Sequence, residues 1–220
     1  MYTEDYIKRM LLMISAVLVQ VLGLKSAGQF EEAHQAAEDS LESLLGMRSH
    51  LITSLDDLTL LRALSNQDVL DNELTRAAAD LLREDALLLA EMGQADEAAA
   101  LFRTALFLYL EDFLSRGGQG PCPPDGTIDE LVKQVPTRSL SDTALFSVFQ
   151  YYEMTGRYIL ALKSIEELDD RSGNSQESGI EIYDYCLRML EKDGDALLSV
   201  GLDRNSLTEK IAELEERIRR

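Results

Sequence analysis

The sequence contains no tryptophan and has few of the residues that usually carry catalytic or metal chemistry. Two cysteines and two histidines occur among its 220 residues. Cys122 and Cys186 stand 64 positions apart and form no Cys-x-x-Cys pair, which argues against a zinc module or a disulfide-rich scaffold. Two isolated thiols are typical of a reducing compartment, so we expect a cytoplasmic protein. A single disulfide between Cys122 and Cys186 is the alternative.

Basic residues are scarce as well. Lysine and arginine together number 21 against 40 aspartates and glutamates, which gives a formal net charge of −19. Phosphate backbones and anionic lipids repel such a charge, so we expect no nucleic acid and no membrane as partner. The sequence also lacks a phosphate loop, a Gly-x-Ser-x-Gly elbow, a His-Glu-x-x-His pair and a Gly-x-Gly-x-x-Gly fingerprint. We therefore expect no cofactor and no enzymatic activity.

Long hydrophobic runs are absent with one exception. Residues 10–24 form a nearly apolar stretch of 15 residues, which is shorter than the roughly 20 residues of a membrane-spanning helix. Glu4 and Asp5 occupy the region that would be basic in a secretory signal. We expect this stretch to belong to a first helix that is buried on most sides.

The apolar residues that are present recur at intervals of three and four, which is typical of helices packed on one face. Examples are Leu41, Leu44 and Leu45, or the stripe that runs from Leu74 to Asp85. Thr127-x-x-Glu130 and Ser206-x-x-Glu209 have the pattern of capping boxes. The sequence predicts an all-α fold with helices over 3–26, 29–45, 49–65, 69–92, 94–116, 127–134, 140–155, 157–170, 177–193 and 205–219.

Two polar segments interrupt the helical pattern. Residues 117–126 hold three of the four prolines, and residues 171–179 form a second polar loop. The first loop separates an N-terminal helical block, 1–116, from a C-terminal block, 127–220. We expect the second block to pack on the first in one continuous domain.

Three segments share one pattern, in which a glycine is followed five residues later by an alanine. The pairs are Gly28 and Ala33, Gly93 and Ala98, and Gly156 and Ala161. Glycine permits a tight turn after a helix, and a small alanine lets two helix backbones approach. The sequence therefore predicts three glycine-hinged helix hairpins that pack through alanine seams. Gly46 and Gly194 are expected to end helices too.

The middle copy, with Ala98, Phe102 and Ala105, resembles the second half of a tetratricopeptide repeat. The copies lie 65 and 63 residues apart, about twice the 34-residue period of that family. The resemblance implies stacked antiparallel hairpins, a tetratricopeptide-like α-solenoid with extra helices and a C-terminal capping helix. Residues 6–111 also resemble a group of bacterial helical proteins to which no activity is attached.

Tetratricopeptide hairpins commonly bind peptides along a concave wall, so the resemblance implies a non-catalytic protein that mediates protein–protein interaction through a groove. Leu18 and Leu22 stand where a carboxylate-gripping member would have lysine or asparagine, which favours a more apolar groove. The net charge favours a basic protein or peptide partner. The alternative is that the wall packs on neighbouring helices. The expected partner-binding residues are Leu22, Lys25, Arg83, Leu87, Gln150 and Glu153.

A second hypothesis is a metal-binding protein or enzyme that uses the helix face of Glu31, His34 and Glu38. Di-iron bundles use Glu-x-x-His twice, and here the motif occurs once. We therefore expect no metal, and interpret these residues as a solvated acidic face. Cys122, between two prolines, is the candidate reactive thiol, and Cys186 lies in an apolar helical pattern typical of a core.

The last helix carries an apolar stripe with coiled-coil spacing, made of Leu207, Ile211, Leu214 and Ile218. Two interpretations compete: the stripe caps the stack by packing on the preceding hairpin, or residues 205–219 form a homodimer. The densest group of aromatic residues lies upstream, at Phe146, Phe149, Tyr151, Tyr152 and Tyr158. Because few basic residues accompany it, we interpret it as helix–helix core, with a binding groove as the alternative.

Overall fold

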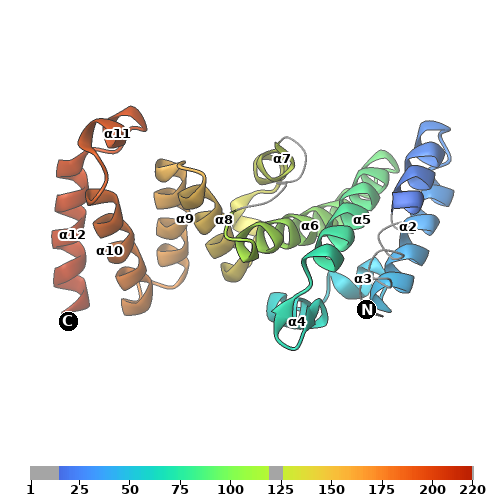
Figure 1. Cartoon of the computed structure of the whole chain (residues 1–220), viewed down its shortest axis with the longest axis horizontal. Coiled ribbons are helices and arrows are strands. Elements are labelled where there is room, and N and C mark those ends of the chain that lie inside the picture. Colours follow the sequence, from blue (N-terminus) through green and yellow to red (C-terminus); the bar gives the residue numbers. More distant parts are fainter. Residues whose placement is uncertain (1–14, 119–125, 220) are drawn as a thin grey trace, which may run out of the picture. The chain divides into compact units, whose positions relative to one another are not determined.

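A computed structural model describes residues 15–118 and 126–219 (Figure 1). The chain divides into two compact units, Met1–Leu140 and Ser141–Arg220. This division lies after the Gly/Pro-rich loop of residues 117–126, because the helix that follows the loop packs on the first unit. The expected all-α class is confirmed, and each unit is described by itself below.

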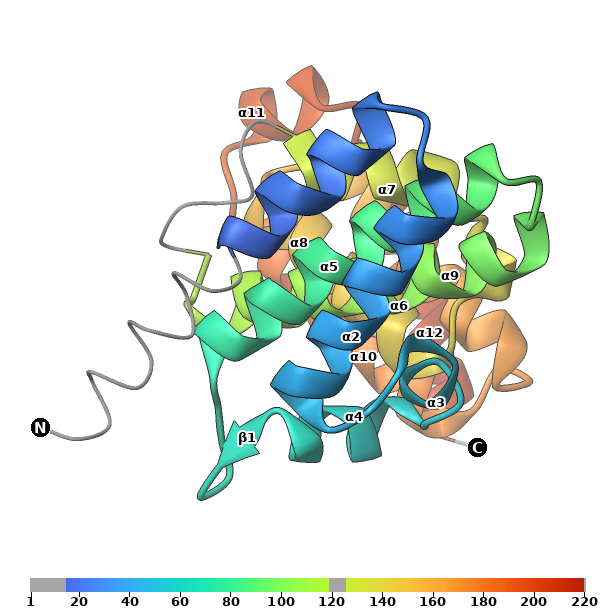
Figure 2. The same cartoon turned by 90° about the vertical axis from the view of Figure 1, so that its right-hand side faces the viewer.

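The first unit consists of helices and one short hairpin of strands. A helix over 15–26 comes first. The elements that follow are α2 (Phe30–Leu45), α3 (Ser49–Ile52), α4 (Asp57–Ala63), β1 (Ser65–Asn66), β2 (Val69–Leu70), α5 (Asn72–Glu91), α6 (Ala95–Ser115), α7 (Thr127–Gln134) and the 3₁₀ turn η2 (Thr137–Ser139). The helix over 15–26 packs on α2 and α5 through a small apolar cluster around Val21, Ala33 and Leu88 (Figure 2).

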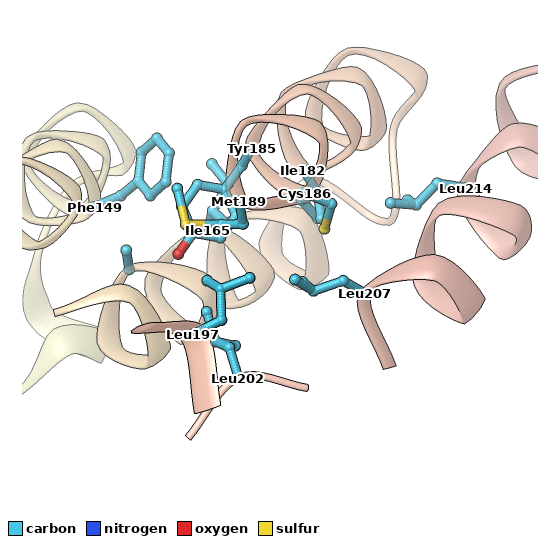
Figure 3. Close-up of a cluster of buried hydrophobic side chains, with 11 residues drawn as sticks. Phe149, Ile165, Ile182, Tyr185, Cys186, Met189, Leu197, Leu202, Leu207 and Leu214 are labelled. Carbon is cyan, nitrogen blue, oxygen red and sulfur yellow. The ribbon is translucent and has the colours of Figure 1, made fainter. Parts of the chain in front are cut away.

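The second unit is built from α8 (Asp142–Met154), α9 (Tyr158–Arg171), α10 (Gln176–Leu190), α11 (Gly194–Ser199) and α12 (Arg204–Ile218). Side chains from these helices meet in one core (Figure 3). Phe149 packs edge-on against Tyr185, with ring centroids 5.5 Å apart. Leu207 and Leu214 of α12 are buried in the same core, so the apolar stripe of the last helix packs within its own unit. The expectation of an aromatic core holds for Phe149 and Tyr151, which are both buried.

The three glycine turns are confirmed and have the same hydrogen bonding. Gly28, Gly93 and Gly156 adopt φ angles of 74°, 80° and 76°. In each turn the next residue donates its N–H to a carbonyl five positions earlier, which is the closing bond of a Schellman motif. These bonds run from Gln29 to Leu24 at 3.0 Å, from Gln94 to Leu89 at 2.8 Å and from Arg157 to Tyr152 at 2.8 Å.

The alanines that follow these turns are buried, as expected for a seam. Ala33, Ala98 and Ala161 are 0%, 2% and 0% exposed. Helices α5 and α6 pack against each other as one such hairpin, and α8 and α9 pack against each other as another. An alanine occupies these positions because a methyl group is the largest side chain that still allows close approach of the helix backbones.

The single helix predicted over 49–65 is wrong. The chain instead forms α3 and α4, and Asp56 begins α4 by accepting a hydrogen bond from the Thr59 N–H at 3.0 Å. A β-hairpin replaces the start of the helix predicted over 69–92. Gln67 and Asp68 form its turn with φ angles of 52° and 63°, a left-handed pair that tight hairpins need and that glycine or asparagine usually supplies.

Three helix-end predictions are also wrong. Gly194 begins α11 rather than ending α10. Gly126, and not Thr127 as the capping-box pattern predicted, is the N-cap of α7. The capping box at Ser206 does not form: Asp203 is the N-cap of α12, and its carboxylate accepts the Ser206 N–H at 3.2 Å. In the last case a better cap three residues upstream extends the helix.

Cys186 lies in the core of the second unit, and burial raises the pKa of its thiol to about 11. This confirms its interpretation as a core residue. Cys122 and residues 3–14 of the first predicted helix lie outside the described residues. In the described part of the chain, no helix combines the length and the apolar character that a membrane crossing requires.

Candidate functional site

The first unit holds an apolar pocket of about 410 Å³ between α6 and the segment that runs from the end of α7 through η2. We call it the arginine pocket because two arginines line it. Its lining residues are Ala90, Ala95, Ala98, Ala99, Phe102, Arg103, Gln134, Val135, Pro136, Arg138 and Ser139.

The sequence of α6 explains why this pocket exists. Ala95, Ala98, Ala99 and Phe102 recur at helical spacing and therefore share one face of α6. Three of the four have only a methyl side chain, so they leave space where larger residues would fill the hollow. The opposite wall begins where α7 ends, since Pro136 has no N–H with which to continue a helix.

The two arginines give the arginine pocket a positive rim. Arg103 lies on α6 and is half-buried, whereas Arg138 lies on η2 and is exposed. Neither makes an ion pair with any residue in the described ranges. Arg116 of the same unit, by contrast, bonds to Asp112 at 2.7 Å. In a chain with 40 acidic residues, two uncommitted guanidinium groups beside an apolar hollow suit an external carboxylate.

The six residues predicted as partner-binding do not line the arginine pocket. Four belong to the first unit. Leu22 is 46% exposed, Lys25 and Leu87 are half-buried, and Arg83 bonds to Glu84 at 2.6 Å.

Gln150 and Glu153 belong to the second unit, where both are half-buried on α8. Both carboxylate oxygens of Glu153 accept hydrogen bonds from Arg188, at 2.8 and 2.9 Å. This bidentate pair links α8 to α10, so Glu153 has a structural role within its own unit.

A second site in the first unit contains ionisable residues. His34 Nδ1 lies 2.5 Å from Asp85 Oδ1, although 51 positions separate the two residues. Glu38 follows His34 by one helical turn and is only 6% exposed. One ligand atom from each of the three residues lies within 4.8 Å of the others. We call these three residues the His34 cluster.

Charges in this cluster perturb one another. The hydrogen bond to Asp85 raises the pKa of His34, and the nearby Glu38 and Glu97 carboxylates add to the rise. Burial raises the pKa of Asp85, against the opposing influence of His34. Both shifts have one consequence: the His34–Asp85 pair retains a proton to higher pH than isolated groups would.

The cluster opens on a pocket of about 250 Å³, whose lining includes His34, Glu38, His50 and Glu97. Both histidines of the sequence therefore line one pocket. Glu31 is exposed on the first turn of α2 and does not belong to the cluster. The expectation of a solvated acidic face holds for Glu31 but is wrong for Glu38, which is buried, and for His34, which is half-buried. Asp85, and not Glu31, lies beside these two residues.

A hollow in the second unit is lined mainly by charged side chains of α9 and α12. Asp169 is 6% exposed there, and it accepts hydrogen bonds from Arg217 at 2.8 and 3.1 Å and from the Ser178 hydroxyl at 2.6 Å. Lys210 pairs with Glu166 nearby. Lys210 and Arg217 of α12 therefore tie Glu166 and Asp169 of α9 to the last helix, so we interpret this hollow as a structural junction between helices.

Comparison of the chain with family models, with curated proteins and with solved structures finds no match.

Sequence reasoning missed Asp85, Arg103 and Arg138. A signal for Asp85 existed, because it interrupts an apolar stripe at a position that the helical period places inside. A charged residue at such a position needs a buried partner. For Arg103 and Arg138 no local pattern gave a signal, since 35 positions separate them.

Proposed function

We propose that this chain is a non-catalytic helical-repeat protein, built from tetratricopeptide-like hairpins, and that its first unit binds a segment of a partner protein in the arginine pocket. The three glycine turns support the repeat interpretation, because they share a left-handed φ and the same closing hydrogen bond. The observation that carries the binding proposal is the pair Arg103 and Arg138, which border an apolar hollow and have no acidic partner among the described residues.

The pocket chemistry defines the partner segment. Alanine methyl groups, Phe102 and Val135 favour one or two apolar side chains, each worth about 1.5–3 kcal/mol when fully buried. The guanidinium groups favour an aspartate, a glutamate or a terminal carboxylate next to those side chains. We therefore propose a segment in which apolar residues adjoin an acidic group.

This acidic segment differs from the basic partner that the net charge of −19 favours. The local positive charge of the arginine pocket determines which segment binds there, because exposed charges more than about 8 Å apart are largely screened at physiological ionic strength. The distributed negative charge acts mainly on the approach of the partner and slows it at low salt. Added salt should therefore speed association.

A peptide-display selection tests the proposal. The wild-type protein should enrich peptides that combine apolar residues with an acidic group, and R103E/R138E should fail to enrich them. The matched control is R62E, since Arg62 is an exposed arginine of the same unit that lies outside the pocket and has no ion pair in the described ranges. The same enrichment with R103E/R138E as with R62E would contradict the proposal.

A further inference from the structure

We propose that the His34 cluster, made of His34, Glu38 and Asp85, binds a divalent transition-metal ion such as Zn²⁺. The site is independent of the proposed peptide binding, because no residue lines both pockets. It also departs from the metal-binding face considered in the sequence, since α5 contributes the third ligand in place of Glu31.

The arrangement of the three side chains supplies a ligand set from two helices. His34 and Glu38 stand one turn apart on α2 and therefore face the same way. Asp85 approaches them from α5, and one donor atom of each residue lies within 4.8 Å of the others. One imidazole nitrogen and two carboxylate oxygens suit Zn²⁺ and its neighbours better than Mg²⁺ or Ca²⁺, which prefer oxygen alone.

Asp85 gives an independent indication of a ligand. Its side chain is 0% exposed, and its Oδ2 atom is buried without a hydrogen-bond partner among the described residues. A buried carboxylate oxygen without a hydrogen-bond partner destabilises the folded state, and native proteins rarely contain one. A cation that the Asp85 carboxylate binds through both of its oxygens would satisfy Oδ2 while taking the position next to Oδ1.

The charges of the cluster also favour a divalent ion. With His34 protonated and both carboxylates ionised, the three side chains sum to −1. If a divalent ion takes the place of the proton that His34 Nδ1 and Asp85 Oδ1 share, the proton leaves to solvent and the sum becomes zero. The separation of these two atoms then increases from 2.5 Å to about 3.4 Å, the spacing of neighbouring ligands around tetrahedral zinc.

The adjoining pocket offers room and further ligands. His50 and Glu97 line it beside His34 and Glu38. A water molecule or one of these side chains can complete four-coordination. The groups facing the cluster are His50 and Glu97 of the pocket and Arg48, which interacts electrostatically with Glu38. Because the metal displaces a proton from the cluster, its affinity should rise with pH.

Zinc titration by calorimetry tests the proposal on the untagged full-length chain. Wild type should bind one Zn²⁺ per chain, and H34Q should bind it at least tenfold more weakly. E31Q is the matched control, since Glu31 is an exposed acid of the same helix outside the cluster, and it should bind like wild type. D85N should behave like H34Q, and thermal melting without metal identifies whether that buried variant folds.

Cobalt substitution provides a readout that does not depend on affinity. Co²⁺ should give a ligand-field spectrum in wild type and E31Q, and H34Q should lose it. The proposal is overturned if wild type binds no zinc at micromolar concentration, or if H34Q binds it as wild type does, which would show adsorption to surface carboxylates. A peptide-binding defect leaves this result unchanged, so the two proposals fail separately.

Discussion

Replacing a seam alanine with leucine tests how the hairpins are held together. Ala161 is 0% exposed and belongs to the core cluster that includes Ile165, Tyr185 and Cys186. Leucine adds three heavy atoms where the helices α8, α9 and α10 already meet. Overpacking of this kind costs about 1–3 kcal/mol, since neighbouring side chains must leave their preferred rotamers or the helices must separate. We expect A161L to lose about 2 kcal/mol of unfolding free energy.

Urea unfolding followed by circular dichroism measures this loss. With a slope of about 2 kcal/mol per molar urea, the midpoint should fall by about 1 M. A212L is the matched control, because Ala212 is exposed on α12 and its replacement should stay within about 0.5 kcal/mol of wild type. If A161L and A212L unfold at the same urea concentration as wild type, the close approach of helices at Ala161 is refuted.

Two further predictions follow from titratable groups. Because the folded-state pKa of His34 is raised, its pair with Asp85 stabilises the folded state fully below pH 6.5, and this contribution is lost as the pH rises through the folded-state pKa. The difference in unfolding free energy between wild type and H34Q, measured by urea unfolding, should therefore be smaller at pH 9 than at pH 6. An equal difference at both pH values would contradict the pairing. Burial raises the pKa of Cys186 to about 11, so C122S should show no reaction with a thiol reagent at pH 8 until denatured, and rapid labelling of the folded chain would contradict the buried position.

The turns could be predicted from the sequence because their chemistry is local. A glycine at positions such as Gly93 tolerates the left-handed φ that a Schellman turn needs, and the alanine five residues on follows from the helical period. The hairpin at residues 65–70 could not be predicted in the same way. Its turn uses Gln67 and Asp68 where glycine or asparagine is usual, so the tertiary context outweighs the local preference.

The candidate sites depend on which helix faces meet, and this the sequence leaves open. His34 and Asp85 lie on helices whose pairing register is fixed by packing, so periodicity shows that Asp85 is buried without showing its partner. The arginine pocket forms because α7 and η2 fold back on α6 after the loop. Arg103 and Arg138 therefore line the same pocket, although no sequence motif links them.

The most direct test of the proposed function is a charge swap across the arginine pocket. The affinity of a selected acidic peptide is measured by fluorescence anisotropy for wild type and for R138E, and again with the peptide acid replaced by lysine. We predict that R138E weakens binding of the acidic peptide at least tenfold, about 1.4 kcal/mol, and that the lysine peptide regains affinity for R138E. Equal affinity of both peptides for both proteins would contradict the account.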